Sequence, residues 1–513
     1  MARTAIYRRM SNCEIETLCA NLEKVLDNFL GLCYNINGTI YKRRKTMQNA
    51  IVRLEEIKIQ NFKNVIDGEL VLKNTRKPYK ASVLGLYGQN GSGKTALIDA
   101  LSILKLVLSG KSVPLQYAEY VNLEADNAKL EFTFSITSPQ GIHNVEYSFN
   151  LRKCRNDNEQ NMVNDKNDVR YMSRIYNECV KYSYHSDAED IPKQTLIDTK
   201  TEKAFAPGTK YRLLIGDDPN DETDLIVEKR MASASARSFI FSSGFLKKFK
   251  EKCESEFYRQ IIESLVFYGN YELFVITTSN SGHIAMGYLP LMFQYEEDGG
   301  TRTGNIPISL NDANYIPENI YSVISRVFDS MNIVLPQIVP GLTVAMKDLG
   351  TDINENGATV RKIRLMSMKN GKELPLQYES EGIKKIISVL QLLIEVYNHS
   401  SITVAIDELD SGVFEYLLGE IIRIVSENGK GQLIFTSHNL RPLETLDKGF
   451  IAFTTTNPSH RYIRLTNIKT NNNLRDFYYR DIILGEQKEE VYAPTNNSEI
   501  AFAFREAGYN NGN

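Results

Sequence analysis

One eight-residue segment constrains this chain more than any other. Gly88 to Thr95 reads Gly-Gln-Asn-Gly-Ser-Gly-Lys-Thr, which fits the pattern G-x-x-x-x-G-K-[ST] at every fixed position. The short apolar stretch Val83 to Tyr87 precedes it, and the apolar stretch Ala96 to Leu108 follows it. The pattern therefore falls between an expected strand and an expected buried helix. This context predicts an α/β fold with a P-loop that holds the phosphates of a nucleotide.

Each part of this loop has a chemical task in phosphate binding. Its glycines let backbone N–H groups turn toward a phosphate chain at the N-terminus of the following helix. The Lys94 ammonium would reach the β- and γ-phosphates, and the Thr95 hydroxyl would bind Mg²⁺. The expected cofactor-binding residues of the loop are Gly88, Asn90, Gly91, Ser92, Gly93, Lys94 and Thr95.

A pair of carboxylates is expected beside this loop. Thr403 to Glu408 reads as an apolar strand that ends in Asp407 and Glu408. In a P-loop fold, Asp407 would hold Mg²⁺ through water, and Glu408 would orient and polarise the attacking water, with Lys94 as a further catalytic residue beside Glu408. A strand that merely ends at an acidic turn is the alternative, and the phosphate loop upstream favours the catalytic interpretation.

A further strand ends in a histidine. Gln432 to Thr436 reads as a buried strand, and it runs into Ser437 and His438. Polar residues after a core strand lie at the carboxyl edge of the sheet, where ligands bind in α/β folds. His438 is therefore expected to contact the γ-phosphate as a catalytic residue, or else to form a structural hydrogen bond.

One helix start has the features of an anion site. The segment Tyr378 to Lys385 precedes a long apolar helix, Ile386 to Tyr397. Ser380 is a natural N-cap, and the free N–H groups behind it would attract an anion. Taken alone, this segment is an ordinary helix start.

The composition is that of an ordinary globular protein of 513 residues, with 42% hydrophobic and 24% charged residues. Lys and Arg number 60 and Asp and Glu number 63, so the net charge of -3 gives no general attraction to nucleic acid or to a membrane. The six cysteines form no C-x-x-C pair, and no apolar run approaches the ~18 residues of a membrane helix. We therefore expect a cytoplasmic protein with reduced thiols and no membrane partner.

The hydrophobic pattern divides the chain into five expected parts. Residues 1–46 are an N-terminal extension in which leucines recur every fourth residue from Leu18 to Leu30, as in an amphipathic helix. Its basic cluster Lys42 to Lys45 is either a solvated linker or a nucleic-acid contact, and translation that starts at Met47 is a further alternative. The other expected parts are an N-terminal ATPase lobe (47–150), an insertion (151–340), a C-terminal ATPase lobe (341–470) and a tail (471–513).

Local patterns predict the elements of the less regular regions. Helices are expected at Phe245 to Val266 and Pro317 to Met331. Polar or turn-rich composition predicts exposed loops at Arg155 to Arg170, Gly216 to Asp224 and Glu297 to Asn305. Two strands between Leu342 and Leu365 are expected to flank a turn. The aromatic and basic cluster Arg475 to Arg480 either docks a partner, stacks on bases or packs as a helix on its own domain.

The order of these segments resembles the ABC-type ATPases, in particular their SMC-, RecF- and OLD-like branch. The shared features are the phosphate loop, a Ser-x-Gly helix start, an acidic strand and a strand-end histidine, over roughly residues 51–110 and 342–455. The opening strand with Asn61-Phe62-Lys63-Asn64 is similar as well, and the resemblance places Lys63 near the nucleotide.

Two segments depart from the pattern of that family. Ser380-Glu381-Gly382 is similar to the family signature, although Glu381 replaces its usual first glycine. Asp410-Ser411 looks like a shortened D-loop, which adds Asp410 to the expected cofactor-binding residues. Gln116 and Gln140 are the candidates for the glutamine of the Q-loop.

The resemblance implies a P-loop NTPase fold of the ABC-ATPase head type, a mixed sheet with flanking helices. It also implies ATP and Mg²⁺ as cofactors and ATP hydrolysis as the reaction. In such proteins the signature of one subunit caps the γ-phosphate held by the phosphate loop of another. Ser380 and Gly382 would then act in trans, and the protein would form a dimer or a higher homo-oligomer through heads that enclose ATP.

Within this branch, the chain is most similar to AAA-labelled ATPases of bacterial phage-defence operons, such as the ATPase subunits of Septu- and PARIS-type systems. The similar phrases are Ser380 to Gly382, Thr436 to Arg441 and Asn473 to Asp476. The resemblance implies that ATP controls a separate effector protein such as a nuclease, because no nuclease constellation is visible and too few residues follow His438 for a Toprim domain. The alternatives are a DNA-repair or chromosome-associated ATPase that binds DNA, a transporter ATPase, and a nucleotide-stabilised scaffold with negligible hydrolysis.

Overall fold

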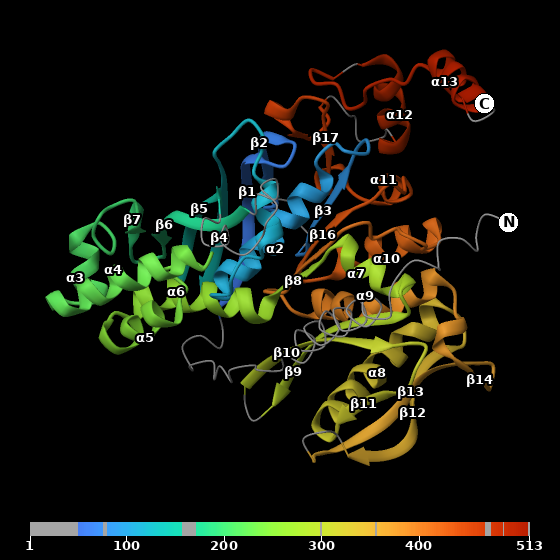
Figure 1. Ribbon diagram of the computed structural model, residues 1–513, viewed down its shortest axis with the longest axis horizontal. Coiled ribbons are helices and arrows are strands. Elements are labelled where there is room, and N and C mark those ends of the chain that lie inside the picture. Colours follow the sequence, from blue (N-terminus) through green and yellow to red (C-terminus); the bar gives the residue numbers. More distant parts are fainter. Residues whose placement is uncertain are drawn as a thin grey trace, which may run out of the picture. The chain divides into compact units, whose positions relative to one another are not determined.

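The computed structural model describes residues 50–74, 80–155, 171–297, 300–353, 357–466, 473–485 and 487–510. These residues form two compact units. The first, called the P-loop unit below, lies within Arg43–Ser281, Glu381–Ile386 and Leu392–Asn513. The second unit comprises, among the described residues, Gly282–Ser380 and Ile387–Gln391. Each unit has its own sheet structure, which can be followed in Figure 1.

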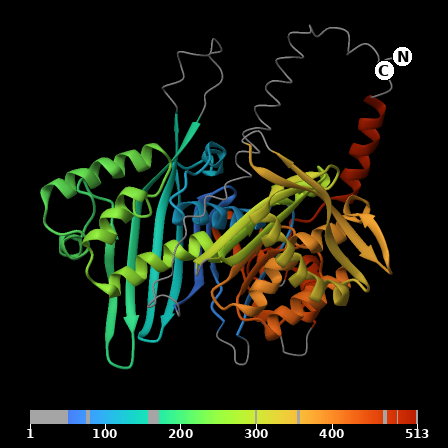
Figure 2. The ribbon, with the colours of Figure 1, turned by 90° about the horizontal axis from the view of Figure 1, so that it is seen from below.

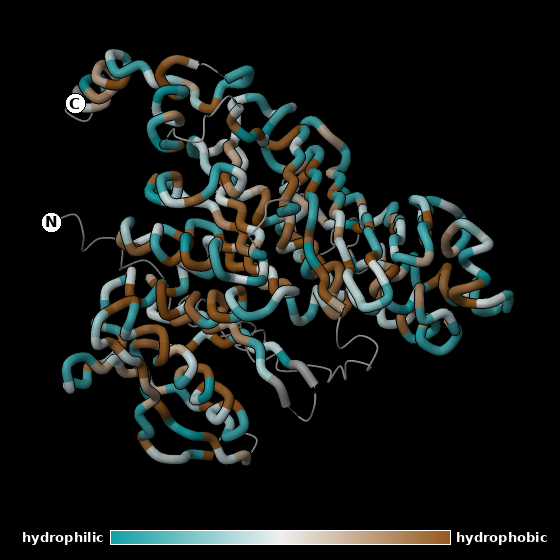
Figure 3. Tube along the Cα trace, turned by 180° about the vertical axis from the view of Figure 1, so that it is seen from behind, coloured by the Kyte–Doolittle hydropathy of each residue, from teal (hydrophilic) through white to brown (hydrophobic). Residues whose placement is uncertain are grey.

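A mostly parallel sheet forms the core of the P-loop unit. Its strand order is β18-β17-β3-β16-β15-β8, and only the edge strand β18 runs antiparallel to its neighbour. The bounds are β3 Ser82–Tyr87, β8 Leu273–Ile276, β15 Thr403–Ile406, β16 Gln432–Thr436, β17 Ile451–Thr454 and β18 Tyr462–Ile463. Every residue of β3, β15 and β16 is buried, as in strands covered on both faces. Figure 3 shows hydrophobic residues gathered along these strands, and all three predicted strands are confirmed.

An antiparallel sheet forms the second layer of the same unit, with the order β2-β1-β4-β5-β6-β7. The bounds are β1 Ile51–Phe62, β2 Val65–Val71, β4 Asn127–Ser138, β5 Gly141–Arg155, β6 Tyr171–His185 and β7 Asp190–Asp198. Leu54, Ile57 and Ile59 are buried between half-exposed neighbours, which confirms the predicted first strand. The tight turn between β1 and β2 carries Lys63 and Asn64.

Helices cover the sheets of the P-loop unit. The long strands of the antiparallel sheet and the helices beside them are visible in Figure 2, and α4 contacts β6. The bounds are α2 Lys94–Leu108, α3 Gly208–Leu214, α4 Pro219–Ala234, α5 Ser243–Lys252, α6 Glu256–Phe267, α10 Glu415–Asn428, α11 Pro442–Thr445, α12 Leu474–Leu484 and α13 Asn497–Asn510. Two helices, α7 Thr278–Ala285 and α9 Glu381–Asn398, cross the boundary between the units.

Two of the helices predicted in this unit can be compared with the packing of their side chains. Helix α2 is buried along most of its length and is followed by Gly110, whose φ of 64° is left-handed. In α12, Phe477 and Tyr478 are buried, and the Tyr478 ring lies 4.6 Å from that of Phe453, centroid to centroid. Part of the aromatic cluster of the tail therefore packs on its own unit.

The second unit is built from a hairpin, a small sheet and one long helix. Strands β9 Tyr288–Glu297 and β10 Gly300–Ser309 pair with each other. The sheet has the order β11-β13-β12, and β14 pairs with β13. The other bounds are β11 Asn314–Pro317, α8 Glu318–Ile338, β12 Leu342–Ile353, β13 Thr359–Lys369 and β14 Lys372–Pro375. In the part of the chain that the structure describes, no helix is both long and apolar enough to cross a membrane.

Two loop predictions are wrong. Glu297 and residues 300–305 belong to the strands of the β9–β10 hairpin, and the ring of Phe293 lies where a side chain at Gly304 would stand. Residues 216–224 include the first turns of α4, where the Asp218 side chain accepts a hydrogen bond from the backbone N–H of Asn220. The polar residues that indicated a loop instead form the cap and the first turns of a helix.

The predicted insertion at 151–340 does not coincide with one of the two units, because its strands belong to different sheets. Strands β6 and β7 extend the antiparallel sheet of the P-loop unit, and β8 is the edge strand of its parallel sheet. Only the residues from Gly282 onward in this range belong to the second unit. The physical reason is that β8 pairs with β15, a contact between residues far apart in the sequence. The predicted N-terminal extension, and the predicted loop beyond Arg155, lie outside the described residues.

The cap of α4 leads to a stability prediction. Asp218→Ala removes the side-chain acceptor at the helix N-terminus and should lower the free energy of unfolding by about 1 kcal/mol. Urea unfolding followed by circular dichroism measures this. The matched control is Asp217→Ala, because the neighbouring carboxylate forms only an exposed ion pair with Arg212 and should matter less. Equal losses in the two variants would contradict the assignment of the cap.

Candidate nucleotide-binding site

Three neighbouring strands deliver the expected site residues to one place. In the order β3-β16-β15, the phosphate loop follows β3, Ser437 and His438 follow β16, and Asp407 and Glu408 follow β15. Because the strands are parallel, their carboxyl ends meet at one edge of the sheet. A cavity of about 460 Å³ opens there, lined by Lys63, Asn64, Asn90, Gly91, Gly93, Lys94, Thr95, Ala96, Asp407, Glu408, Thr436 and His438.

The phosphate loop has the backbone geometry that its glycines allow. Gly88 and Gly93 have φ values of 151° and 95°, and a side chain at Gly88 would collide with the Thr454 hydroxyl. Ser92 is buried, donates a hydrogen bond to the carbonyl of Gln89 (2.6 Å) and contacts the Thr454 hydroxyl. Gly88 and Ser92 therefore shape the loop, whereas Asn90, Gly91, Gly93, Lys94 and Thr95 line the cavity.

Lys94 is held inside its own loop. Its ammonium donates hydrogen bonds to the carbonyl oxygens of Gly88 (2.8 Å) and Gln89 (2.9 Å). Burial lowers the pKa of Lys94, while the carboxylates of Asp407 and Glu408 act in the opposite direction. A phosphate chain in the cavity would offer the ammonium stronger, charged acceptors than the two carbonyls.

The Thr436 hydroxyl links the two carboxylate residues. It donates a hydrogen bond to Oδ1 of Asp407 (2.6 Å) and accepts one from the backbone N–H of Glu408 (2.8 Å). Asp407 is 1% exposed, and its Oδ2 atom has no hydrogen-bond partner among the described residues. A buried carboxylate oxygen without a donor fits a hard cation such as Mg²⁺, for which the Thr95 hydroxyl supplies a second oxygen at the same cavity.

Glu408 has a strained backbone. Its φ is 48°, in the left-handed region that residues with a side chain seldom adopt. The hydrogen bond from its N–H to Thr436 helps to hold this conformation, and its carboxylate reaches the cavity. Strain of this kind is common where a side chain must be placed for function.

The turn between β1 and β2 contributes a cation from the other sheet. Lys63 has a φ of 52°, lines the cavity, and forms an ion pair with Asp99 of α2. Its ammonium lies 3.9 Å from the ring centroid of Tyr120. Burial raises the pKa of Asp99, and the charge of Lys63 counteracts that effect. The structure thus brings Lys63 to the phosphate loop.

Sequence reasoning missed several residues that support this geometry. Arg461 donates hydrogen bonds to the carbonyls of Thr455 and Asn64 (2.6 Å each), and the Tyr462 hydroxyl donates one to the carbonyl of Gly93 (2.9 Å). The contacts with Asn64 and Gly93 join residues 397 and 369 positions apart, so no local sequence pattern indicates them. Thr436 did carry a signal, because it is a polar residue at the end of a buried strand.

His438 and Asp410 lie together at the edge of the site. His438 is exposed and lines the cavity. One carboxylate oxygen of Asp410 accepts hydrogen bonds from the backbone N–H groups of His438 (3.0 Å) and Asn439 (2.9 Å). Asp410 itself does not line the cavity, so within one chain it orients the segment that carries the histidine.

The start of α9 packs against the Asp410 segment. A side chain at Gly382 would collide with the backbone carbonyl of Gly412, so glycine is required for this close approach. Glu381 pairs with Lys384 (3.2 Å). Lys385 is buried; this burial lowers its pKa, and the carboxylates of Glu408, Asp407 and Asp410 counteract the effect.

The remaining predicted residues lie elsewhere. Gly382, like Asp410, is not among the residues that line the cavity. Ser380 is an exposed residue at the boundary of the two units. Of the candidates for a Q-loop glutamine, Gln116 is in a short 3₁₀ helix (Leu115–Tyr120) and Gln140 in the turn between β4 and β5, and neither lines the cavity.

Comparison with known proteins gives one match to a family model. Residues 56–260 match the model described as an AAA domain, which is less than half of the chain. A search of curated proteins gave no match. The matched segment includes the phosphate loop, and together with the strand order it confirms the predicted α/β fold of a P-loop ATPase head.

Solved structures that match this chain include SMC heads and RecF. An Smc head bound to the C-terminal winged-helix domain of ScpA has 10% identity and a TM-score of 0.37, with 81% of this chain and 98% of that chain covered. The SMC head domain from Thermotoga maritima has 14% identity and a TM-score of 0.34, with 80% and 99% covered. The recombination mediator protein RecF has 13% identity and a TM-score of 0.33, with 80% and 98% covered.

The position of Thr436 leads to a prediction. Thr436→Val leaves Oδ1 of the buried Asp407 without its donor and should lower the free energy of unfolding by about 1–3 kcal/mol. Thr436→Ser is the matched control, because it keeps the hydroxyl. Both variants are compared with the unchanged protein by urea unfolding. If the valine variant is as stable as the serine variant, the hydroxyl does not hold Asp407 in the way described.

Proposed function

We propose that this chain is an ATPase that binds ATP with Mg²⁺, hydrolyses it, and uses ATP to join two copies through their heads. We propose further that this dimerisation controls a separate effector protein, such as a nuclease, in antiphage defence. The observation that carries the ATPase proposal is the arrangement of Asp407, Thr436 and Glu408 opposite the phosphate loop at one cavity.

The charges at the cavity support a polyphosphate bound together with a cation. Lys63 and Lys94 face the cavity as cations, and Asp407 and Glu408 face it as carboxylates. The four charges sum to zero, so the residues alone do not neutralise a triphosphate. A divalent cation between the phosphates and Asp407 would supply the missing positive charge.

Each residue then has a task in hydrolysis. Thr95 and Asp407 would hold Mg²⁺, which neutralises charge that develops on the phosphate oxygens during transfer. Lys94 would leave its carbonyl acceptors and bind the β- and γ-phosphates. Glu408 would accept a hydrogen bond from the attacking water and orient it, and His438 at the cavity edge would contact the γ-phosphate.

The surface beside α9 supports the dimer proposal. Gly382 and Asp410 belong to segments in mutual contact but do not line the cavity of their own chain. Phe414, which follows the Asp410 segment, is 71% exposed, and Tyr416 is 54% exposed. Exposed aromatic side chains are common at protein interfaces. In a dimer, Ser380 and Gly382 of one copy would close over the ATP held by the other.

The defence role rests on the similarity of short phrases to ATPases of phage-defence operons. It is therefore one of two roles that we consider for the same ATPase. The alternative is a DNA-repair or chromosome-associated ATPase of the SMC or RecF kind that binds DNA. The two roles differ in what the ATP-bound protein holds, and co-purification separates them.

A complementation experiment tests whether each active site is a composite site, which is built from residues of two copies of the chain. Lys94→Ala should abolish hydrolysis because it removes the phosphate-binding cation. Ser380→Arg should also abolish it, because a large side chain at this exposed position would keep the signature segment away from the ATP of the other copy. In a mixture of the two inactive proteins, a mixed dimer has one intact composite site. Phosphate release should then recover to a sizeable fraction of the activity of the unchanged protein, whereas sites within one chain would give no recovery.

Glu381 provides the control for that experiment. It replaces a glycine of the family signature and is exposed. Glu381→Ala should keep phosphate release within about twofold, because only the helix terminus and not its side chain would face the nucleotide. Loss of hydrolysis in this variant would show that the carboxylate itself takes part.

The partner is found by trapping the ATP-bound state. Glu408→Gln should retain bound ATP with little turnover, and Lys94→Ala should bind ATP poorly. Tagged forms of both are purified from cells, and the eluates are compared by mass spectrometry and assayed for nucleic acid. A stoichiometric nuclease or toxin-like protein with Glu408→Gln supports the defence role, and abundant DNA with repair proteins supports the alternative. Wild-type turnover no faster than that of Glu408→Gln would contradict the ATPase proposal.

A further inference from the structure

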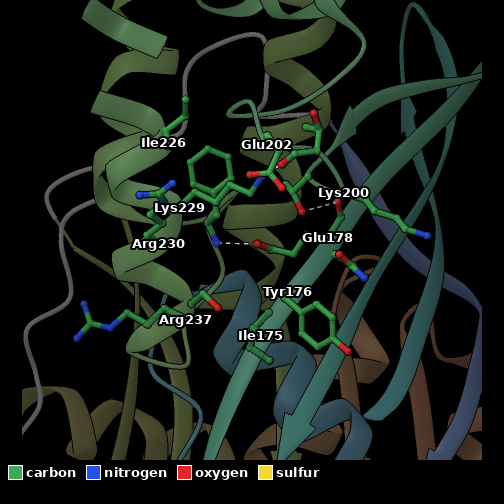
Figure 4. Close-up of a pocket in the computed structure, with 14 residues that line it drawn as sticks. Ile175, Tyr176, Glu178, Lys200, Glu202, Ile226, Lys229, Arg230 and Arg237 are labelled. Atoms are coloured by element: carbon green, nitrogen blue, oxygen red, sulfur yellow. Dashed lines mark hydrogen bonds between the residues drawn. The ribbon is translucent and has the colours of Figure 1, made fainter. Parts of the chain in front are cut away.

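A second cavity lies in the P-loop unit, away from the phosphate loop. It has a volume of about 580 Å³ and is enclosed by β6, the segment after β7, and α4 with the residues that follow it. We call it the β6–α4 cavity. Figure 4 shows Lys229, Arg230 and Arg237 on the helix side and Tyr176 and Glu178 on the strand side. Its volume is in the range of sites for small ligands.

The walls of this cavity are fixed by hydrogen bonds. The Lys229 ammonium donates to the backbone carbonyls of Thr201 (2.7 Å) and Lys203 (2.9 Å), which ties α4 to the segment after β7. The backbone N–H of Thr199 donates to the carbonyl of Glu178 (2.9 Å), which ties the same segment to β6. The cavity is therefore formed before any ligand binds, which reduces the entropy cost of binding.

The strand wall contains an irregularity. Between the pairs Ser148–Cys179 and Asn150–Tyr176, two residues of β6 lie opposite one residue of β5, and Asn177 has a φ of 51°. Such a bulge turns successive side chains away from their regular alternation and is common beside binding sites. Asn177 and Glu178 both line the cavity.

The carboxylate of Glu178 is used within the protein. It accepts hydrogen bonds from the Tyr147 hydroxyl (2.7 Å), the backbone N–H of Phe239 (2.7 Å) and the Ser238 hydroxyl. Glu178 is 2% exposed, and burial raises its pKa. Its carboxylate oxygens thus accept hydrogen bonds from donors behind the wall.

The cations of the cavity outnumber its carboxylates. Lys200, Lys229, Arg230 and Arg237 line it, against Glu178 and Glu202. Within the described residues, the side chains of Lys200, Arg230 and Arg237 form no ion pair or hydrogen bond with another residue. In Figure 4 the charged ends of Lys200 and Arg237 extend outward at the rim. Unpaired guanidinium groups around a preformed cavity suit a phosphate, because their planar donors match its oxygens.

We propose that the β6–α4 cavity binds a small phosphate-bearing molecule, separate from the nucleotide of the P-loop. Arg230 would bind the phosphate, and the Thr201 and Ser233 hydroxyls would offer further donors. Ile226 and Phe239 give the cavity an apolar wall against which a base or sugar packs. The shared chemistry is the phosphate, which a nucleotide or an inorganic polyphosphate would bring.

The test uses the full chain with Lys94→Ala, which weakens phosphate binding at the P-loop. AMP and inorganic pyrophosphate are titrated separately at low salt by isothermal titration calorimetry. We expect saturable binding of at least one probe. Tighter binding of AMP identifies a nucleotide site, and tighter binding of pyrophosphate identifies a polyphosphate site. Absence of saturable binding of either probe up to the millimolar range overturns the proposal.

Substitutions assign the binding to the cavity. Adding Arg230→Glu should weaken binding roughly tenfold or more, since hydrogen bonds to a charged group are lost and a like charge is introduced. Lys247→Glu is the matched control, because this exposed lysine of α5 does not line the cavity. Ser233→Asp provides a second variant that places a negative charge inside it, and thermal unfolding checks that each variant is folded. Equal weakening by Lys247→Glu, or none by both cavity variants, overturns the assignment.

Discussion

The parallel pairing of β3, β16 and β15 is the constraint on which the site depends. Residues more than 300 positions apart in the sequence reach one sheet edge only because these three strands run in the same direction in this order. A change of register by one residue would turn Asp407 and Thr436 to opposite faces of the sheet. The buried apolar side chains of all three strands hold the register, so packing of the core fixes the position of the residues that line the cavity.

Burial of charge gives this edge its chemical character. Lys94, Asp99 and Asp407 are all nearly inaccessible to water, and each is near a group of opposite charge. Removing a single partner from such a group leaves a buried charge without compensation, which costs far more than the net gain from the pair. The hydrogen bonds of Thr436 and the ion pair of Lys63 with Asp99 thus keep the charges in place before a nucleotide arrives.

The sequence allowed the local parts of this site to be predicted, and the tertiary contacts remained hidden. The phosphate loop and the carboxylates after β15 were recognisable because each lies in one continuous segment with a strand beside it. The roles of Thr436 and Asp99 depend on partners 29 and 36 residues away. The hairpin of β9 and β10 was missed because glycine residues in a sequence usually indicate a turn. Only the structure shows that the Phe293 ring packs against Gly304 within the hairpin. The start of α4 was missed because a capping aspartate has the same polar character as a loop.

The cavity at the phosphate loop and the β6–α4 cavity differ in how their charges are balanced. Among the described residues that line the cavity at the phosphate loop, cations and carboxylates are equal in number, and Oδ2 of Asp407 has no donor, so an anionic ligand there is best neutralised by an additional cation. At the β6–α4 cavity, the carboxylate of Glu178 is engaged by three donors behind the wall, and the side chains of Arg230 and Arg237 form no ion pair or hydrogen bond with another described residue. An anion can therefore be neutralised there by side chains alone. The same unit thus offers one site suited to a metal–phosphate complex and one suited to a phosphate without a metal.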